Sequence, residues 1–148
     1  MYEREVAVPR LLRWYSGTET LPHPLLAEAR DQLNRYYATE PEDRFVTAGM
    51  CLYRDGRDSV AWHGDRIGRG RRKDTMVAIL SLGETRRLQL RPDPDRRPPG
   101  ATLTFALGHG DLVVMGGSCQ RTWQHAVPKT AEPCGPRISI QFRPRGVL

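Results

Sequence analysis

Two histidines, one aspartate and two arginines are the residues of this chain best suited to act together in chemistry. His63 and Asp65 flank a glycine, His125 lies much further along the chain, and Arg137 and Arg143 stand near its end. Two histidines and one carboxylate can bind Fe(II) on one face and leave its other positions open to O2 and an oxidisable co-substrate. The two arginines could then hold a dicarboxylate. Together these residues predict an iron-dependent oxygenase site.

The tripeptide His-Gly-Asp occurs twice, at 63–65 and at 109–111. Spacing alone does not rank the two copies. The second copy lies between two short apolar runs, at 101–107 and 112–115, where a glycine-rich segment is typical of a tight turn. We therefore interpret the second copy as structural and assign the first copy to the metal.

His125 has two other interpretations. A lone histidine on a half-buried strand is more often a satisfied structural residue than a ligand. Cys119, His125 and Cys134 could also hold zinc, but their spacings differ from those of common zinc sites. The presence of Arg137 and Arg143 favours the iron interpretation.

One helix followed by many short strands is the pattern that the remaining sequence predicts. Apolar residues at helical spacing predict a helix over 24–37, with Pro24 in its first turn. The proline- and glycine-rich stretch 91–100 is expected to be an exposed hairpin loop. Short strands separated by turns indicate an antiparallel sandwich or a double-sheet jelly roll, and they are expected at 48–53, 59–63, 75–82, 86–91, 101–107, 112–115, 121–127 and 136–142.

Length and composition indicate one intracellular domain. A chain of 148 residues fits a single domain, 1–148. No apolar run reaches the roughly 20 residues that a membrane-spanning helix needs, and the first residues do not resemble a secretory signal. The three cysteines, Cys51, Cys119 and Cys134, form no C-x-x-C pair. We therefore expect a cytoplasmic monomer with reduced thiols and no membrane partner.

The chain is basic, with a formal charge of +6 and a pI near 9.7. Many of the positive charges fall within 66–73, directly after the first His-Gly-Asp. Lysines and arginines that neutralise phosphates give salt-dependent binding to nucleic acids. This segment is therefore either a phosphate-binding loop or an ordinary solvated loop.

Five segments, in their order and spacing, resemble the AlkB family of Fe(II)- and 2-oxoglutarate-dependent dioxygenases, which repair or edit N-alkylated bases. They span most of the chain and read YRDGRDSVAWHGD (53–65), SLG (81–83), GHGDLVVMGG (108–117), HAVPK (125–129) and PRISIQFR (136–143). Each segment is modest alone, but together they are specific. In the family the second His-Gly-Asp position is a structural turn, in agreement with the interpretation above.

The resemblance implies a mainly β fold, a double-stranded β-helix or jelly roll, with one N-terminal helix packed outside. It divides the domain into an N-terminal helix and partial substrate lid at about 1–47 and a catalytic jelly roll at 48–148. The cofactors would be Fe(II), 2-oxoglutarate as co-substrate, and O2. The catalytic metal ligands would be His63, Asp65 and His125. Arg137 would bind the distal carboxylate of 2-oxoglutarate, with the Tyr53 hydroxyl assisting, and Arg143 would lie by the keto-acid end.

Four positions depart from the family pattern. Cys51 stands where the family commonly has asparagine, and Ser139 and Gln141 replace an asparagine and a threonine. Cys51 and Ser139 are still expected to line the co-substrate site, with a thinner polar shell. Ile67 replaces a carboxylate that DNA-repair members place near the cationic methylated base. This change weakens the expectation of a preference for 1-methyladenine and 3-methylcytosine.

The activity that the resemblance implies is oxidative demethylation of N-alkylated nucleobases in DNA or RNA, with release of succinate, CO2 and formaldehyde, as in repair of DNA alkylation damage. The substrate would be single-stranded or have its base flipped out. For Tyr15 and the adjacent Trp14, core packing is an equal alternative to stacking on that base. Two other functions stay open: a 2-oxoglutarate oxygenase acting on a protein or small molecule, and a catalytically idle nucleic-acid-binding module. The residues predicted to contact substrate are Tyr15, Trp62, Arg66, Ile67, Arg69 and Arg71.

Overall fold

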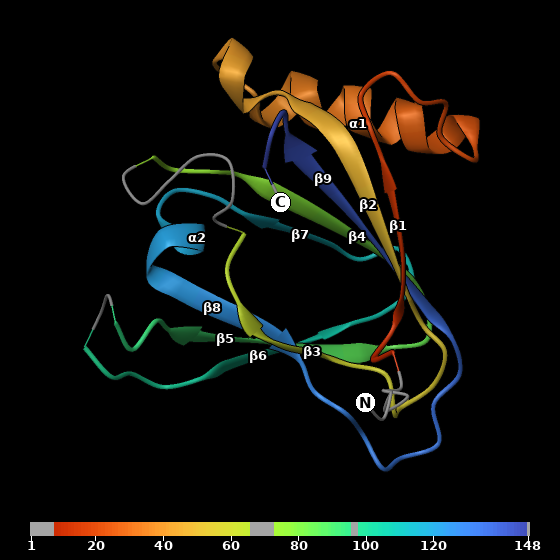
Figure 1. Cartoon of the computed structure of the whole chain (residues 1–148), viewed down its shortest axis with the longest axis vertical. Helices are drawn as coiled ribbons and strands as arrows, with labels where there is room; N and C mark the ends of the chain where they lie inside the picture. Colours follow the sequence, from red (N-terminus) through yellow and green to blue (C-terminus); the bar gives the residue numbers. More distant parts are fainter. Residues whose placement is uncertain (1–7, 66–72, 96–97, 148) are drawn as a thin grey trace, which may run out of the picture.

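The computed structural model describes residues 8–65, 73–95 and 98–147, which form two β-sheets and one long helix (Figure 1). The elements in chain order are β1 (Leu11–Tyr15), α1 (Pro24–Tyr37), the 3-10 helix η1 (Pro41–Asp43), β2 (Phe45–Tyr53), β3 (Val60–His63), β4 (Val77–Gly83), β5 (Arg86–Pro92), β6 (Leu103–Leu107), β7 (Leu112–Met115), α2 (Cys119–Thr122), β8 (Trp123–Val127) and β9 (Arg137–Pro144).

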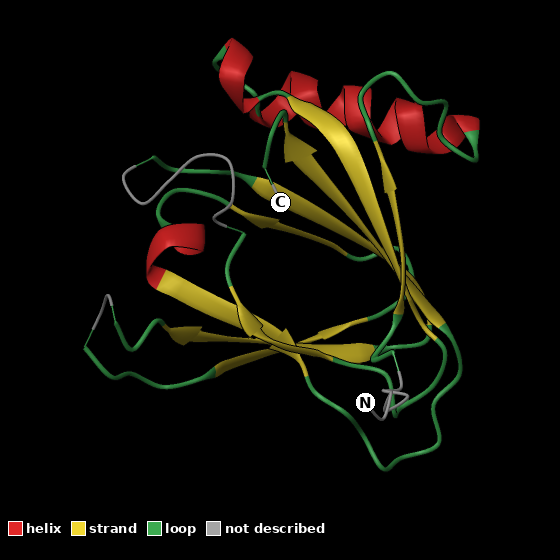
Figure 2. Ribbon diagram, viewed as in Figure 1, coloured by secondary structure: helices red, strands yellow, loops and turns green. Residues whose placement is uncertain are grey.

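The two sheets face each other, and within each sheet the neighbouring strands are antiparallel. The larger sheet has the order β1-β2-β9-β4-β7, and the smaller sheet has the order β3-β8-β5-β6. Figure 2 shows helix α1 lying along the outer face of the larger sheet. This arrangement confirms the mainly β jelly roll with an outer helix that the sequence predicts.

Apolar side chains fill both spaces between these layers. One buried cluster joins the two sheets and includes Ile79 and Leu88. A second cluster lies between α1 and the larger sheet and is centred on Phe142, which is fully buried. On the central strand β9, Phe142 is paired with Ala48 on one side and Ala78 on the other, so two small side chains leave room for its ring. Strands β2, β4 and β9 are thus covered on both faces, which explains why their sequences do not alternate strictly between apolar and polar residues.

Helix α1 has the bounds that the sequence predicts. Pro24 occupies its first turn, and the preceding His23 caps it by accepting a hydrogen bond from the Leu25 N–H at Nδ1 (3.1 Å). Near its other end the buried Asn34 amide donates to the Phe45 carbonyl (3.0 Å) and accepts from the Phe45 N–H (2.6 Å). Asn34 thereby fixes the helix to the start of β2. Neither α1 nor any other helix of the described residues is long and apolar enough to cross a membrane.

Two elements near the site differ from those that the sequence predicts. Strand β1 occupies a segment without a predicted strand, because it lies at a sheet edge and four of its five residues are exposed. Residues 119–122 form the short helix α2, so that β8 begins at Trp123 rather than at 121. This helix carries Gln120, whose side chain is buried. Both elements contribute residues to the site described below.

Replacing Asn34 with alanine is expected to lower the free energy of unfolding by about 2 kcal/mol, because the buried N–H and carbonyl of Phe45 would lose their partners. Urea denaturation followed by circular dichroism measures this change. The matched control is Gln32→Ala on the exposed side of the same helix, with an expected change of less than about 0.5 kcal/mol. Equal losses in the two variants would contradict the anchoring role of Asn34.

Candidate metal and co-substrate site

His63, Asp65 and His125 come together where β3 pairs with β8. His63 is opposite His125 in the antiparallel pairing, and their ring centroids are 4.2 Å apart. Asp65 Oδ1 lies 3.7 Å from His63 Nε2, and one potential ligand atom from each of the three residues lies within 4.8 Å of the others. Two nitrogen donors and one carboxylate at this spacing fit Fe(II) bound on one face. Within the described residues no such group contains Cys119 or Cys134, the alternative zinc ligands.

Hydrogen bonds from surrounding residues hold these candidate ligands in place. His63 Nδ1 lies 2.8 Å from the Ala61 carbonyl oxygen, and donation to that oxygen leaves Nε2 free for a metal. The Asp65 N–H donates to Gln120 Oε1 of helix α2 (2.8 Å). Arg143 Nε donates to Asp65 Oδ2 (2.8 Å) in an ion pair with little exposure to solvent. The second carboxylate oxygen, Oδ1, is thereby left on the side of His63.

The surroundings keep the two buried candidate ligands, His125 and Asp65, in the protonation states that can bind a metal. Burial, together with the neighbouring His63, lowers the pKa of His125 to about 4, so that its imidazole is neutral at neutral pH. Burial by itself raises the pKa of Asp65, but Arg143 and the two histidines outweigh this effect, and the net pKa is lowered. A neutral histidine and an ionised aspartate are the forms that a metal ion requires.

The second His-Gly-Asp copy forms a turn. His109 Nδ1 accepts a hydrogen bond from the Gly83 N–H (2.9 Å), and Asp111 Oδ2 accepts one from the Gly108 N–H (2.8 Å). Gly110 between them has φ +85°, a conformation that favours glycine. The side chains of this copy are therefore used to close the connection between β6 and β7, as the sequence predicts.

A cavity of about 50 Å³ lies between the sheets beside the metal group, and both histidines line it. Arg137 is only 2% exposed; its Nε donates to Ser81 Oγ (2.8 Å), while its buried Nη1 has no hydrogen-bond partner among the described residues. The Tyr53 ring lies beside it, with 5.2 Å from Arg137 Cζ to the ring centroid. A buried cationic donor without a partner is costly. The cavity therefore fits a carboxylate that pairs with Arg137, as 2-oxoglutarate would.

A second pocket, of about 330 Å³, leads from the metal group to the surface at β1. It shares several residues with the inner cavity, among them His63, Gln141 and Arg143. Trp14 of β1 lines this outer pocket and is 43% exposed. A molecule at the surface can thus reach the metal group past an aromatic ring.

The residues predicted to bind substrate lie in different places. Of the two adjacent aromatic residues of β1, Trp14 lines the outer pocket, whereas Tyr15 packs against the cluster beneath α1. This favours core packing for Tyr15. Trp62 stacks against Arg91, with 4.3 Å from Arg91 Cζ to the ring centroid. Four further predicted contacts lie outside the described residues, and their roles stay predictions: Arg66, Ile67, Arg69 and Arg71.

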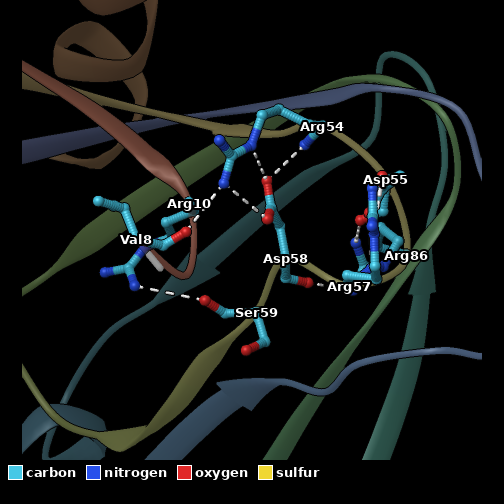
Figure 3. A network of polar contacts seen from close by, with 8 residues as sticks. All are labelled: Val8, Arg10, Arg54, Asp55, Arg57, Asp58, Ser59 and Arg86. Atoms are coloured by element: carbon cyan, nitrogen blue, oxygen red, sulfur yellow. Dashed lines mark hydrogen bonds and ion pairs between the residues drawn. The ribbon is translucent and has the colours of Figure 1, made fainter. Parts of the chain in front are cut away.

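Arg10 is a site residue that sequence reasoning missed. It lines both the cavity and the outer pocket, and its buried Nε has no hydrogen-bond partner among the described residues. Figure 3 shows the contacts that place it: Arg10 Nη1 donates to the Ser59 carbonyl (3.4 Å), while Arg54 pairs with Asp58 (2.8 Å) and donates to the Val8 carbonyl (2.8 Å). These contacts join segments far apart in the chain, so no local pattern signals the position of Arg10.

The departures Cys51, Ser139 and Gln141 form one cluster that lines the cavity, and Cys51 and Gln141 also line the outer pocket. Cys51 and Ser139 are paired across β2 and β9. Gln141 Nε2 donates to Ser139 Oγ, and Cys51 Sγ donates to Gln141 Oε1 (3.6 Å). Gly49 is opposite Gln141, and a Cβ there would lie 3.1 Å from Gln141 Oε1 and 2.9 Å from Arg143 Nη1. The absence of a side chain at Gly49 therefore makes room for both head groups.

The class of protein follows from this fold and site together with a family match. The 2OG-Fe(II) oxygenase superfamily model matches residues 12–143. The chain belongs to this superfamily, and its membership confirms the cofactor class expected from the sequence: Fe(II), 2-oxoglutarate and O2.

Within the superfamily the chain is similar to AlkB proteins, which confirms the resemblance seen in the sequence. It is 33% identical to alpha-ketoglutarate-dependent dioxygenase alkB homolog 3 of Bos taurus, over 93% of this chain and 54% of that protein. It is 30% identical to DNA oxidative demethylase ALKBH2 of Arabidopsis thaliana, over 77% of this chain and 42% of that protein. The chain thus spans about half the length of the curated relatives that it matches.

Solved structures share the fold at lower identity. A prolyl-4-hydroxylase of Pseudomonas putida has a TM-score of 0.56 and 20% identity, over 91% of this chain and 72% of that chain. The structure of OsALKBH1 gives a TM-score of 0.51 and 18% identity, over 82% and 60% of the two chains. At these identities the likeness supports the jelly-roll fold alone.

Replacing Gly49 with alanine is expected to weaken 2-oxoglutarate binding about tenfold, because the new Cβ displaces the Gln141 and Arg143 head groups. Isothermal titration of the Co(II)-loaded protein measures the affinity. Gly116→Ala is the matched control, since its Cβ would meet only the Met76 side chain, at ordinary distances of 3.6 and 3.9 Å. A Gly49→Ala protein that binds 2-oxoglutarate as tightly as the parent protein would refute the role of this space.

Tyr53 is expected to ionise only at strongly alkaline pH, because burial raises its pKa to about 12. Between its ordinary value of 10.0 and about 12, the unfolded chain loses this proton while the folded chain keeps it. The contribution of Tyr53 to stability is therefore complete below that range and is lost as the pH rises through it. Absorbance titration of Tyr53→Phe should differ from the parent protein only in the most alkaline part of the curve. An early-titrating phenol missing from the variant would contradict this assignment.

Proposed function

We propose that this chain catalyses Fe(II)- and 2-oxoglutarate-dependent oxidative removal of N-linked methyl groups from nucleobases in DNA or RNA. The observation that carries the proposal is the position of the His63, Asp65 and His125 group beside a buried cavity in which Arg137 Nη1 lacks a partner among the described residues. Bound Fe(II) with 2-oxoglutarate would supply the oxidation, in which O2 converts the co-substrate to succinate and CO2 and the methyl group leaves as formaldehyde.

The residues of the chain have separate tasks in this proposal. Arg137 and the protonated hydroxyl of Tyr53 hold the distal carboxylate of 2-oxoglutarate, since both are buried and close together in the cavity. Arg143 orients Asp65 and lies toward the keto-acid end. His63 Nε2 faces Asp65 Oδ1 on the side that opens to the outer pocket. The iron ligands are thus held by protein contacts, while the oxidisable substrate enters from the surface.

The outer pocket supports a nucleobase as the substrate. Trp14 presents an exposed aromatic ring at this pocket, and aromatic rings stack on unpaired bases. The formal charge of +6 favours a polyanion. The base must come from a single strand or be flipped from a duplex to reach the metal. Similarity to proteins named DNA oxidative demethylase points in the same direction.

The test is methyl loss from a panel of methylated DNA, RNA and peptide substrates, read by mass spectrometry with Fe(II), ascorbate and 2-oxoglutarate present. We expect methyl loss from nucleic acid, with formaldehyde and succinate formed in equal amounts. Methyl loss from peptides alone would indicate a protein substrate instead. No methyl loss from any substrate, together with no succinate, would favour the catalytically idle nucleic-acid-binding module.

His63→Ala is the control for the metal assignment in the same assay. Removal of one ligand should abolish succinate formation and methyl loss while leaving the salt-dependent affinity for nucleic acid largely intact. Succinate formation at the parent rate by this variant would show that the three residues are not the metal ligands.

A further inference from the structure

Arg91 lies on the outer face of the smaller sheet, behind the metal histidines. In the pairing of β5 with β8, Leu90 is opposite His125, and Arg91 is opposite Gln124. Adjacent residues of a strand point to opposite faces of the sheet. Leu90 and His125 face the space between the sheets, so Arg91 and Gln124 face outward.

On this outer face the Arg91 guanidinium joins two strands. Its Cζ lies 4.3 Å from the centroid of the Trp62 ring on β3. Its Nε and Nη2 both donate to Gln124 Oε1 on β8, at 3.1 and 2.9 Å. Trp62 directly precedes His63, and Gln124 directly precedes His125. One side chain thus connects the residues that stand next to two of the three metal ligands.

Among the described residues, strand β3 has a neighbouring strand on one side only. It is a four-residue strand at the edge of the smaller sheet, with β8 as its neighbour. Its pairing with β8 places Val60 opposite Val127 and His63 opposite His125, with a shift of register between these pairs. A regular ladder of hydrogen bonds is interrupted at such a shift. The backbone pairing alone therefore defines the orientation of His63 weakly.

We infer that Arg91 is a positioning residue of the metal site, which holds His63 opposite His125 by acting through Trp62 and Gln124. The inference rests on the proposed iron site and adds to it a residue that touches neither metal nor substrate. It also gives Trp62 a role other than substrate contact. Partners that orient metal ligands typically change metal affinity by about 10- to 100-fold when they are removed. Because Arg91 acts one step further out, we expect the lower end of that range.

Co(II) binding to the full chain, followed by isothermal titration and visible absorption, tests this inference. Arg91→Met removes the guanidinium and keeps the length of the side chain, and its Co(II) dissociation constant should rise about tenfold. The absorption spectrum of bound Co(II) should also change, because it reports the geometry of the ligands rather than the stability of the fold. The matched control is Arg87→Met, an exposed arginine on the same face of β5, with affinity and spectrum unchanged.

A second pair of variants tests whether the effect runs through the tryptophan. Trp62→Leu and Arg91→Met should weaken Co(II) binding together by less than the product of their separate effects, since either one breaks the same contact. Gln124→Ala removes the side chain that accepts the Arg91 hydrogen bonds and takes the place of Arg91→Met if that protein does not fold. Independent effects of the two substitutions would overturn the inference, as would parent-like affinity and spectrum in Arg91→Met or Gln124→Ala.

His63→Ala separates this inference from the proposed function. If the parent chain binds Co(II) no more tightly than His63→Ala, the proposed metal site is wrong and the role of Arg91 falls with it. If the parent chain binds Co(II) and His63→Ala does not, the metal site stands, and the Arg91 variants alone decide the inference.

Discussion

The candidate site depends on one buried ion pair, in which Arg143 Nε donates to Asp65 Oδ2 at 2.8 Å. Arg143 belongs to β9, the middle strand of the larger sheet, and Asp65 follows β3 at the edge of the smaller sheet. The pair therefore links the two sheets where the metal group lies. The side chains are only 14% and 4% exposed, and charges this well buried are tolerated when they are paired and hydrogen-bonded. The same contact uses one oxygen of the Asp65 carboxylate and leaves the other for a metal, so a single interaction connects the fold, the metal group and the co-substrate cavity.

The cavity next to this pair carries an excess of positive charge. Arg10, Arg137 and Arg143 all line it, and Asp65 is paired with Arg143. Burial lowers the pKa of Arg137, which reflects the cost of keeping a guanidinium charged inside the protein. A dicarboxylate brings two negative charges to this place and supplies a partner for Arg137 Nη1, which has none among the described residues. A ligand that binds only the folded state also stabilises that state. The same excess of positive charge, which is costly without a counter-charge, thus favours an anionic co-substrate in this cavity.

Local patterns in the sequence predict the helices and strands better than they predict contacts between segments far apart in the chain. Helix α1 has its predicted bounds because its apolar spacing and Pro24 act within one element. His63, Asp65 and His125 could be proposed as iron ligands because a family motif marks them, and the structure brings those three residues together. Trp62 is different: it is one of the residues predicted to contact substrate, yet adjacent residues of a strand face opposite sides, and the ring stacks on Arg91. The position of Arg10 depends on how the first described residues pack against the loop after β2, which no local pattern encodes.

Three of the departures from the family pattern lie side by side in the folded chain. In the sequence, Cys51, Ser139 and Gln141 are three separate replacements of polar residues that the family has around the co-substrate. In space they are one hydrogen-bonded cluster, with the longer Gln141 amide reaching both the Cys51 thiol and the Ser139 hydroxyl. That reach requires an empty position on the neighbouring strand, and Gly49 provides it. A glutamine amide has two donors and two acceptor sites, of which this cluster uses one of each. Gln141 lines both the cavity and the outer pocket, so the polar shell of the site is built from a different set of side chains rather than removed.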